Sequence, residues 1–324
     1  MDELPDIMAY GFDGRGGAMA LSVDEIGAPS HDTHAFTWVH LRRDDPAARR
    51  LLEGCGLDSF VIEALTADET RPRCTVHGDG VVLNLRGVNL APGAEPEDMI
   101  SVRFWIEGRR VIGVWLRSLQ AVRDFSQAIE RQQAPKSPGD FIAKLTLRLS
   151  DRAEPTVAEL NERIDQIEDD VLVEALRVPR SELSRFRRKA IAIRRYMVPQ
   201  RDALTTLEIE DLDWLTTHDR SRIREAADRV TRLGEELDAI RDRAQILHDE
   251  IMDQRAERMN KNTFLLSIIA SIFLPLGLVT GLLGINVGGI PGAQNPWAFW
   301  EVVMILGVIA VVQFVMLRMF GFFR

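Results

Sequence analysis

The apolar residues of this 324-residue chain are concentrated near its C-terminus. Residues 263–286, TFLLSIIASIFLPLGLVTGLLGIN, contain no charged side chain, and residues 298–317 contain only Glu301 and Gln313 as strongly polar side chains. Twenty helical residues extend about 30 Å, which is the thickness of the hydrocarbon core of a bilayer. A core helix of a soluble protein seldom lacks a polar face over so long a run. The pattern therefore predicts two membrane-spanning helices.

The segment between the two spans, GINVGGIPGAQNPW, is short, uncharged and rich in glycine. It is too short for a domain and predicts a hairpin turn on the far side of the membrane. Basic residues flank both outer ends of the pair, and the positive-inside rule then places both chain termini in the cytoplasm. The start of the chain, MDELPDIMAYGFDGRGG, is acidic and has no apolar run, so it does not resemble a signal peptide. The flanking basic residues are Arg255, Arg258, Lys261, Arg318 and Arg324.

From about Asp32 to Ser150 the chain alternates between short apolar runs and short amphipathic runs, separated by turn residues. This alternation predicts an α/β or α+β domain over residues 1–150, with Glu107-Gly108 at a hairpin tip. The predicted strands are 35–41, 81–90, 100–108 and 109–117, and the predicted helices are 44–57, 58–68 and 119–132.

Longer helices are predicted from Pro155 onward, with a break at Val178-Pro179. A regular 3-4 spacing of apolar residues then runs from Ile223 to Ile251, and no proline follows before Pro275. We therefore expect one helix from near Asp219 to near Leu283, which requires partners along its length. The predicted segments are an α/β domain (1–150), a helical stalk (151–260), the first span (261–284), a periplasmic loop (285–297) and the second span with the C-terminus (298–324).

Charge divides the chain in the same way. Residues 261–324 contain three basic residues and one acidic residue, so the first 260 residues carry 37 of the 40 basic and 48 of the 49 acidic side chains, a net charge of −11. Such an acidic part argues against nucleic acid as a partner and is compatible with cation traffic. Cys55 and Cys74 are too far apart in sequence for a CxxC pair and are expected to be free thiols. No phosphate-binding glycine loop, nucleophile elbow or hydrolase metal motif is present in the sequence, so we do not expect an enzyme.

Two spans cannot enclose a water-filled path, so transport of a polar solute would require several subunits around an axis. The first span carries a stripe of mostly small or hydroxylated residues at helical spacing, which suits that axis. The same spacing is equally typical of a small-residue packing seam between helices. The stripe consists of Thr263, Ser267, Ala270, Leu274, Gly277 and Gly281.

The end of the first span carries a resemblance to a known family. A long helix enters a span that ends in Gly284-Ile285-Asn286 and is followed by a short loop and one final span, and this arrangement resembles the CorA family of divalent-cation transporters. The family signature there is Gly-Met-Asn. Ile285 in place of Met, together with the loop VGGIPG, is similar to the zinc-transporting branch called ZntB. The WVHL strand near residue 40 and the TRPRC segment at 70–74 extend the resemblance over the whole chain.

The resemblance implies a CorA-like homopentameric funnel in the inner membrane, with a pore lined by five copies of the first span. Gly284, Ile285 and Asn286 match the signature positions at the outer mouth, where five Asn286 amides would hydrogen-bond the water shell of a hydrated dication. The expected cargo is Zn²⁺, with Cd²⁺, Ni²⁺, Co²⁺ and Mg²⁺ as further candidates, and uptake coupled to protons is expected for the zinc branch. No resident cofactor is expected.

Four further residues are candidates for contact with a cation or a proton: His248, Asp249 and Asp253 on the stalk helix, and Glu301 at the outer end of the second span. A solvated acidic face explains the stalk residues equally well. Glu301 is equally well explained as a residue at the membrane interface that faces the lipid headgroups. The alternative functions are a magnesium or cobalt channel of the same family and, from another class, a membrane-anchored coiled-coil scaffold that conducts nothing.

Overall fold

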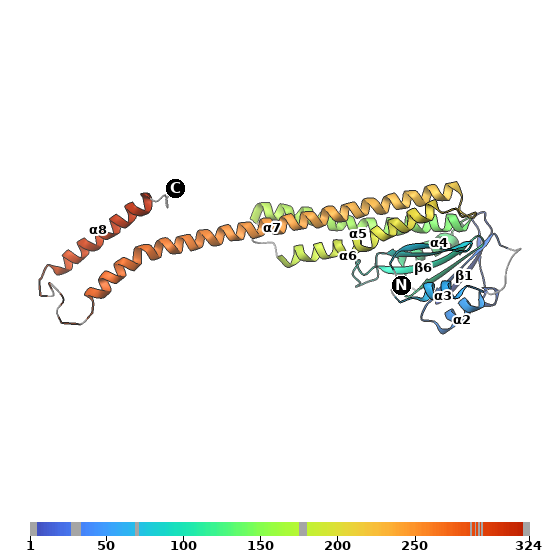
Figure 1. Ribbon diagram of the computed structural model, residues 1–324, viewed down its shortest axis with the longest axis horizontal. Helices are drawn as coiled ribbons and strands as arrows, with labels where there is room; N and C mark the ends of the chain where they lie inside the picture. Colours follow the sequence, from blue (N-terminus) through green and yellow to red (C-terminus); the bar gives the residue numbers. More distant parts are fainter. Residues whose placement is uncertain are drawn as a thin grey trace. The chain divides into compact units, whose positions relative to one another are not determined.

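The computed structural model describes residues 5–26, 34–68, 71–174, 180–285, 287–288, 290, 292 and 294–319. The chain divides into two compact units, Met1–Asp249 and Glu250–Arg324. The first unit holds a sheet and the helices up to α6, and the second unit holds α8; helix α7 begins in the first unit and ends in the second (Figure 1). The boundaries of the five segments predicted from the sequence remain a prediction.

One seven-stranded sheet organises the first unit, with strand order β2-β1-β3-β7-β6-β5-β4. All neighbouring pairs are antiparallel except β3 and β7, which run parallel. The hairpin predicted at Glu107-Gly108 joins β6 to β7, where Glu107 is paired with Arg110. The strands are β1 Ile7–Phe12, β2 Ala18–Ala20, β3 Phe36–Arg42, β4 Arg73–His77, β5 Gly80–Gly87, β6 Ile100–Glu107 and β7 Arg110–Trp115. The predicted α/β fold class is confirmed, although the sequence analysis missed β1, β2 and β4.

Helices α2 (Pro46–Gly54) and α3 (Ser59–Thr66) pack on one face of the sheet. Each begins after an aspartate whose side chain accepts a hydrogen bond from a backbone N–H of the first turn, Asp45 from Ala47 and Asp58 from Phe60. Their apolar sides join sheet residues in one buried cluster that includes Leu41, Leu52, Leu65 and Val114. The short helix α1 (Val23–Ile26) adds Ile26 to this cluster.

Helices α4 (Gln120–Glu130) and α5 (Pro138–Glu174) build the second layer of the core. Phe125 of α4 and Phe141 of α5 lie edge-on to Trp38 of β3, with ring centroids 5.6 and 5.0 Å away. Because its first turns pack in this core, α5 begins well before Pro155, where the sequence analysis placed the change to long helices. Pro155 lies inside α5, and Pro199 lies inside α6 (Arg180–Ile209). The predicted break at Val178-Pro179 lies outside the described residues.

Helix α7 runs from Thr217 to Leu283, within two residues of the predicted start and at the predicted end. A reciprocal cap fixes its beginning, since Asp219 N–H donates to the Thr216 hydroxyl and Thr216 N–H donates to the Asp219 carboxylate, both at 3.2 Å. The predicted apolar seam is confirmed, because all nine of its members are buried: Ile223, Ala226, Val230, Leu233, Leu237, Ile240, Ala244, Leu247 and Ile251.

One titratable residue lies in the middle of this core. His40 of β3 is 1% exposed and stacks between Phe104 and Trp115, with ring centroids 6.1 and 6.0 Å away. Gly113 faces it on β7, where a Cβ would come within 2.2 Å of His40 Nδ1. Burial lowers the pKa of His40 to about 3, so the ring is neutral at neutral and mildly acidic pH.

His40 should therefore make the first unit sensitive to mild acid. The unfolded chain takes up a proton near the ordinary histidine pKa of about 6.5 whereas the folded chain does not, so stability falls as the pH drops below that value. Between pH 6.5 and 5 this one group should remove about 1.6 kcal/mol from the free energy of unfolding. The measurement is chemical unfolding of the full chain in detergent against pH. His40→Gln should lose this part of the slope; equal slopes in both proteins would show that His40 is already protonated when folded.

Candidate functional site

The apolar part of α7 and the helix α8 (Ala298–Met319) form the hairpin of the second unit (Figure 1). Both helices are long and apolar enough to cross a bilayer, with mean hydropathies of 2.2 and 2.4 over their most apolar stretches. In the stretch of α7 none of the residues is buried, and in that of α8 6% of the residues are. A core helix of a soluble protein would be covered by its own chain, so that explanation of the first span is excluded. The hairpin needs lipid or further subunits around it.

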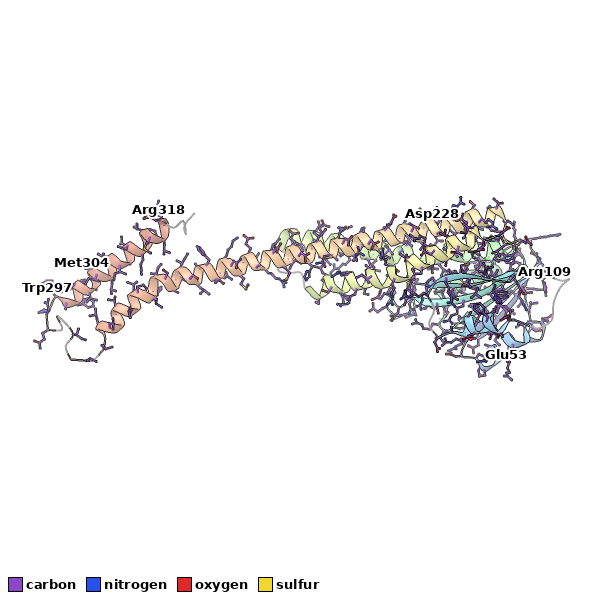
Figure 2. The ribbon with its side chains drawn as sticks, in the orientation of Figure 1. Glu53, Arg109, Asp228, Trp297, Met304 and Arg318 are labelled. Atoms are coloured by element: carbon purple, nitrogen blue, oxygen red, sulfur yellow. The ribbon has the colours of Figure 1, made fainter. Side chains whose placement is uncertain are left out.

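The residues at the ends of α8 fit a membrane crossing. Trp297 lies just before its first residue and Arg318 lies in its last turn, with Met304 between them (Figure 2). Tryptophan prefers the boundary between headgroups and hydrocarbon, and arginine reaches back to the same zone on the other side.

The two helices contact each other through one face each. On α7 the half-buried positions are Ile268, Ile272, Pro275, Leu276 and Val279. On α8 the half-buried positions repeat at helical spacing and are Ala298, Val302, Leu306, Ile309, Ala310, Gln313 and Leu317.

The stripe predicted from the sequence lies on the other side of α7. All six of its members are exposed in the single chain: Thr263, Ser267, Ala270, Leu274, Gly277 and Gly281. At 3.6 residues per turn, the mean direction of the stripe and that of the half-buried face lie about 160° apart around the helix axis, so the two faces are nearly opposite. The stripe is therefore not a seam between the two helices of one hairpin, and it remains available to other subunits or to an axis between them.

The chemistry of the stripe is polar but neutral. Ser267 Oγ donates to the backbone carbonyl of Thr263 at 2.9 Å, which leaves its lone pairs as acceptors. At Gly277 and Gly281 no atom outside the helix backbone lies within 4 Å of where a Cβ would be, and the Thr280 hydroxyl donates to the Gly277 carbonyl at 3.2 Å. Leu274 is the bulky apolar member and is 75% exposed. Such a surface can hydrogen-bond the water around an ion but cannot replace that water with charged ligands.

The signature tripeptide follows the last residue of α7 directly. Gly284 N–H donates to the carbonyl of Thr280 at 2.9 Å, which closes the end of the helix, and Ile285 is 49% exposed. Asn286, the residue on which the proposed outer ring depends, lies outside the described residues.

Glu301 is engaged by its own helix start. Asn295 Oδ1 accepts from Trp297 N–H at 3.0 Å, and Asn295 Nδ2 donates to Glu301 Oε1 at 3.4 Å. A carboxylate in the first turn of α8 is also favoured by the helix dipole. Both interactions account for Glu301 without a metal.

The stalk candidates do not form a metal site within one chain. In the first unit, Asp249 accepts from Gln245 Nε2 at 2.8 Å and lies 3.2 Å from His248 Nδ1. These two hydrogen bonds lower the pKa of Asp249, so its exposed carboxylate is ionised at neutral pH. In the second unit, Asp253 is exposed. Among the described residues, no three His, Cys, Asp or Glu side chains come together as metal ligands.

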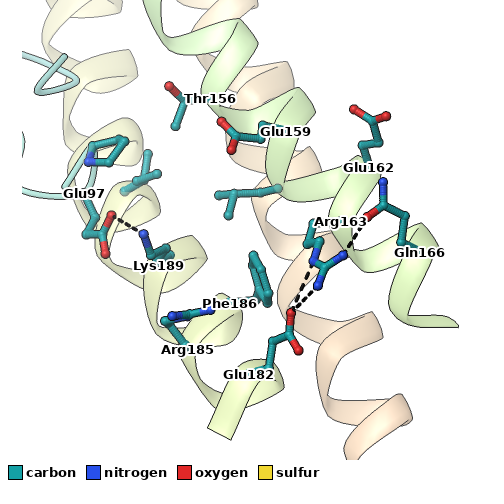
Figure 3. Close-up of a pocket in the computed structure, with 13 residues that line it drawn as sticks. Glu97, Thr156, Glu159, Glu162, Arg163, Gln166, Glu182, Arg185, Phe186 and Lys189 are labelled. Carbon is teal, nitrogen blue, oxygen red and sulfur yellow. Dashed lines mark hydrogen bonds and ion pairs between the residues drawn. The ribbon is translucent and has the colours of Figure 1, made fainter. Parts of the chain in front are cut away.

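A cavity of about 480 Å³ lies in the first unit between α5, α6 and the loop before β6 (Figure 3). Two ion pairs lie in its wall. Arg163 Nη2 donates to Glu182 Oε1 at 2.7 Å, and Lys189 Nζ lies 3.5 Å from Glu97 Oε2. Among the described residues its side chains form no group of three metal ligands, and we assign the cavity no part in the ion pathway.

Comparison with known proteins places this arrangement in a family. Residues 33–319 match the family described as CorA-like Mg²⁺ transporter protein. The chain is 37% identical over 320 residues to the divalent cation transporter CmaX of Pseudomonas aeruginosa, which covers 98% of this chain and 96% of the relative. It is 34% identical over 304 residues to the zinc transport protein ZntB of Pectobacterium carotovorum, with 94% and 91% covered. The structure of full-length CmaX covers 98% of this chain and 99% of its own, at 35% identity and a TM-score of 0.85.

These similarities extend over both units and confirm the fold class and the family resemblance inferred from the sequence. They agree with the expectation of a transporter rather than an enzyme. The chain is a membrane protein that belongs to the CorA family of divalent-cation transporters.

Proposed function

We propose that the chain carries zinc ions across the inner membrane through a homopentameric pore lined by five copies of α7, with both termini in the cytoplasm. The observation that supports this proposal most directly is the position of the neutral polar stripe, which is exposed on the side of α7 away from α8. A hairpin of two helices cannot enclose water by itself. Copies of α7 arranged around an axis would bring five stripes together and leave α8 toward the lipid.

A pore with this lining suits an ion that keeps its water. Removing water from a small dication costs far more than neutral carbonyls and hydroxyls return. The stripe offers the Ser267 hydroxyl and, at Gly277 and Gly281, backbone that no side chain of its own residue covers. Asn286 at the outer mouth would add a ring of amide oxygens that hydrogen-bond the water shell.

Zinc is favoured by the similarity to ZntB and by the loop after the first span. That loop contains no acidic residue, and Ile285 stands where the family signature has Met. The second candidate is a magnesium or cobalt channel, which the description of the family favours. Cadmium and nickel are further cargoes for a site that selects size and hydration.

Proton coupling requires a titratable group along the path. The lowered pKa of Asp249 makes this carboxylate a poor proton carrier near neutral pH and a better attractor of cations. Of the groups named from the sequence for coupling, this leaves His248 and Glu301 as the ones to test.

Ion flux into proteoliposomes tests the proposal as a whole. We expect zinc uptake that increases with an inward proton gradient and is unaffected by excess magnesium. Magnesium flux that is blocked by hexamminecobalt, a mimic of hydrated magnesium, would establish the second candidate instead. If intact pentamers carry no divalent cation at all, the remaining function is the membrane-anchored scaffold that conducts nothing.

Asn286→Ala tests the outer mouth. The substitution removes five amides, each with a hydrogen bond worth about 1 kcal/mol. Either the zinc flux or the selectivity for zinc should therefore fall by at least about tenfold. The pentamer should remain assembled in size-exclusion chromatography with light scattering. Unchanged flux and selectivity would contradict the assignment of the mouth.

Cysteine labelling tests which side of α7 meets water. Thiols react as thiolates, which form in water and not in apolar surroundings, so Ser267→Cys and Gly277→Cys should react with a membrane-impermeant thiol reagent on the order of tenfold faster than Ile272→Cys and Val279→Cys. The native background is low, because Cys55 is buried and burial raises the pKa of Cys74 to about 12. Equal rates on both faces would contradict a water-lined stripe.

A further inference from the structure

The first span contains an interruption of its backbone hydrogen bonds. Pro275 lies inside α7, eight residues before its end. In an unbroken helix the N–H of residue 275 would donate to the carbonyl of Ser271, but proline has no N–H. Hydrocarbon offers no replacement donor, so a carbonyl left free at this depth is costly.

A side chain of the other span supplies the missing donor. Gln313 Nε2 of α8 donates to the carbonyl oxygen of Ser271 at 3.3 Å. Gln313 belongs to the half-buried face of α8 that contacts α7. Both residues lie at least about 9 Å inside the ends of the apolar helices at 1.5 Å per residue. An amide side chain there is explained by the carbonyl that it satisfies.

The amide oxygen of Gln313 is buried in the hairpin as well. Gln313 Oε1 is enclosed and has no hydrogen-bond partner among the described residues. An apolar residue at this position would avoid that unsatisfied oxygen, so packing alone does not account for glutamine. The hydroxyls of Ser267 and Thr280 are satisfied within α7 itself, as Thr280 Oγ1 donates to the carbonyl of Leu276 at 3.0 Å.

We infer that Gln313 is a positioning residue for transport, which holds the part of the first span after Pro275 in its orientation by capping the Ser271 carbonyl. Gly277 and Gly281 lie after the proline, so this bond sets the direction in which the last third of the stripe faces. The inference rests on the proposed pore, because only there does the direction of the stripe affect flux.

A double-mutant cycle in the full-length protein tests the inference. The four proteins are the wild type, Gln313→Met, Pro275→Ala and the double variant, each measured for heat stability in detergent and for zinc and magnesium flux in proteoliposomes. Gln313→Met keeps the length of the side chain and removes the donor. Pro275→Ala restores the backbone N–H for Ser271, and Pro275→Gly does the same while tolerating a bend. Leu306→Met, on the same face of α8, is the matched control.

We expect Gln313→Met to change flux about threefold to fifteenfold, the range of interhelical hydrogen bonds in membranes, and to lower heat stability. The same substitution should change neither quantity once residue 275 is Ala or Gly, and Leu306→Met should leave both near the wild-type values. Equal effects of Gln313→Met with and without Pro275 would overturn the inference. So would coupling in heat stability with unchanged flux, because Gln313 would then only stabilise the hairpin. If the wild type itself carries no divalent cation, the proposed pore fails, and the role of Gln313 in transport fails with it, whereas the stability cycle still decides the hydrogen bond.

Discussion

The demand that every backbone polar group in hydrocarbon finds a partner governs the second unit of this protein. Helices satisfy this demand within themselves, and the chain departs from it inside the first span only where Pro275 removes a donor. The Gln313 amide on the neighbouring helix α8 donates a hydrogen bond to the carbonyl that Pro275 leaves without a donor. The contact joins α7 to α8, and the small and hydroxylated residues lie on the face of α7 away from α8. A single satisfied carbonyl thus links the packing of the hairpin to the surface that we propose for the pore.

The first unit obeys a different constraint, because water is available everywhere except in its core. Its sheet buries an aromatic cluster around Trp38 on one face and an aliphatic cluster around Leu41 on the other. The long helices continue this burial through the apolar seam of α7, and their charges pair on the outside, as Arg243 does with Asp165 at 2.6 Å. Such exposed pairs contribute little stability each. The seam provides the stability, and the acidic surplus remains free to attract cations.

Sequence periodicity predicted the elements whose pattern is local. The two spans, the extent of α7 and the hairpin between β6 and β7 all agree with the structure, because runs and alternation within a dozen residues specify them. Strands β1 and β4 were missed, since their short mixed sequences become strands only by pairing with β3 and β5. The stripe was identified from spacing, but its direction relative to α8 was not. The contact between Ser271 and Gln313 joins residues 42 positions apart, and no local pattern indicates it.

The charge distribution limits what the field of the protein can do for transport. The first 260 residues carry a net charge of −11, whereas the loop between the spans has none. In the proposed topology, cations would concentrate at the cytoplasmic end of the path and not at its mouth. A static field raises the local concentration and the rate of encounter, but it gives no direction to a cycle at equilibrium, because attraction on entry is repaid on exit. Net movement must therefore come from the ion gradient, the membrane potential or a coupled proton. The ionised Asp249 contributes to the static electric field. Proton coupling requires a different group, one that changes its charge during the transport cycle.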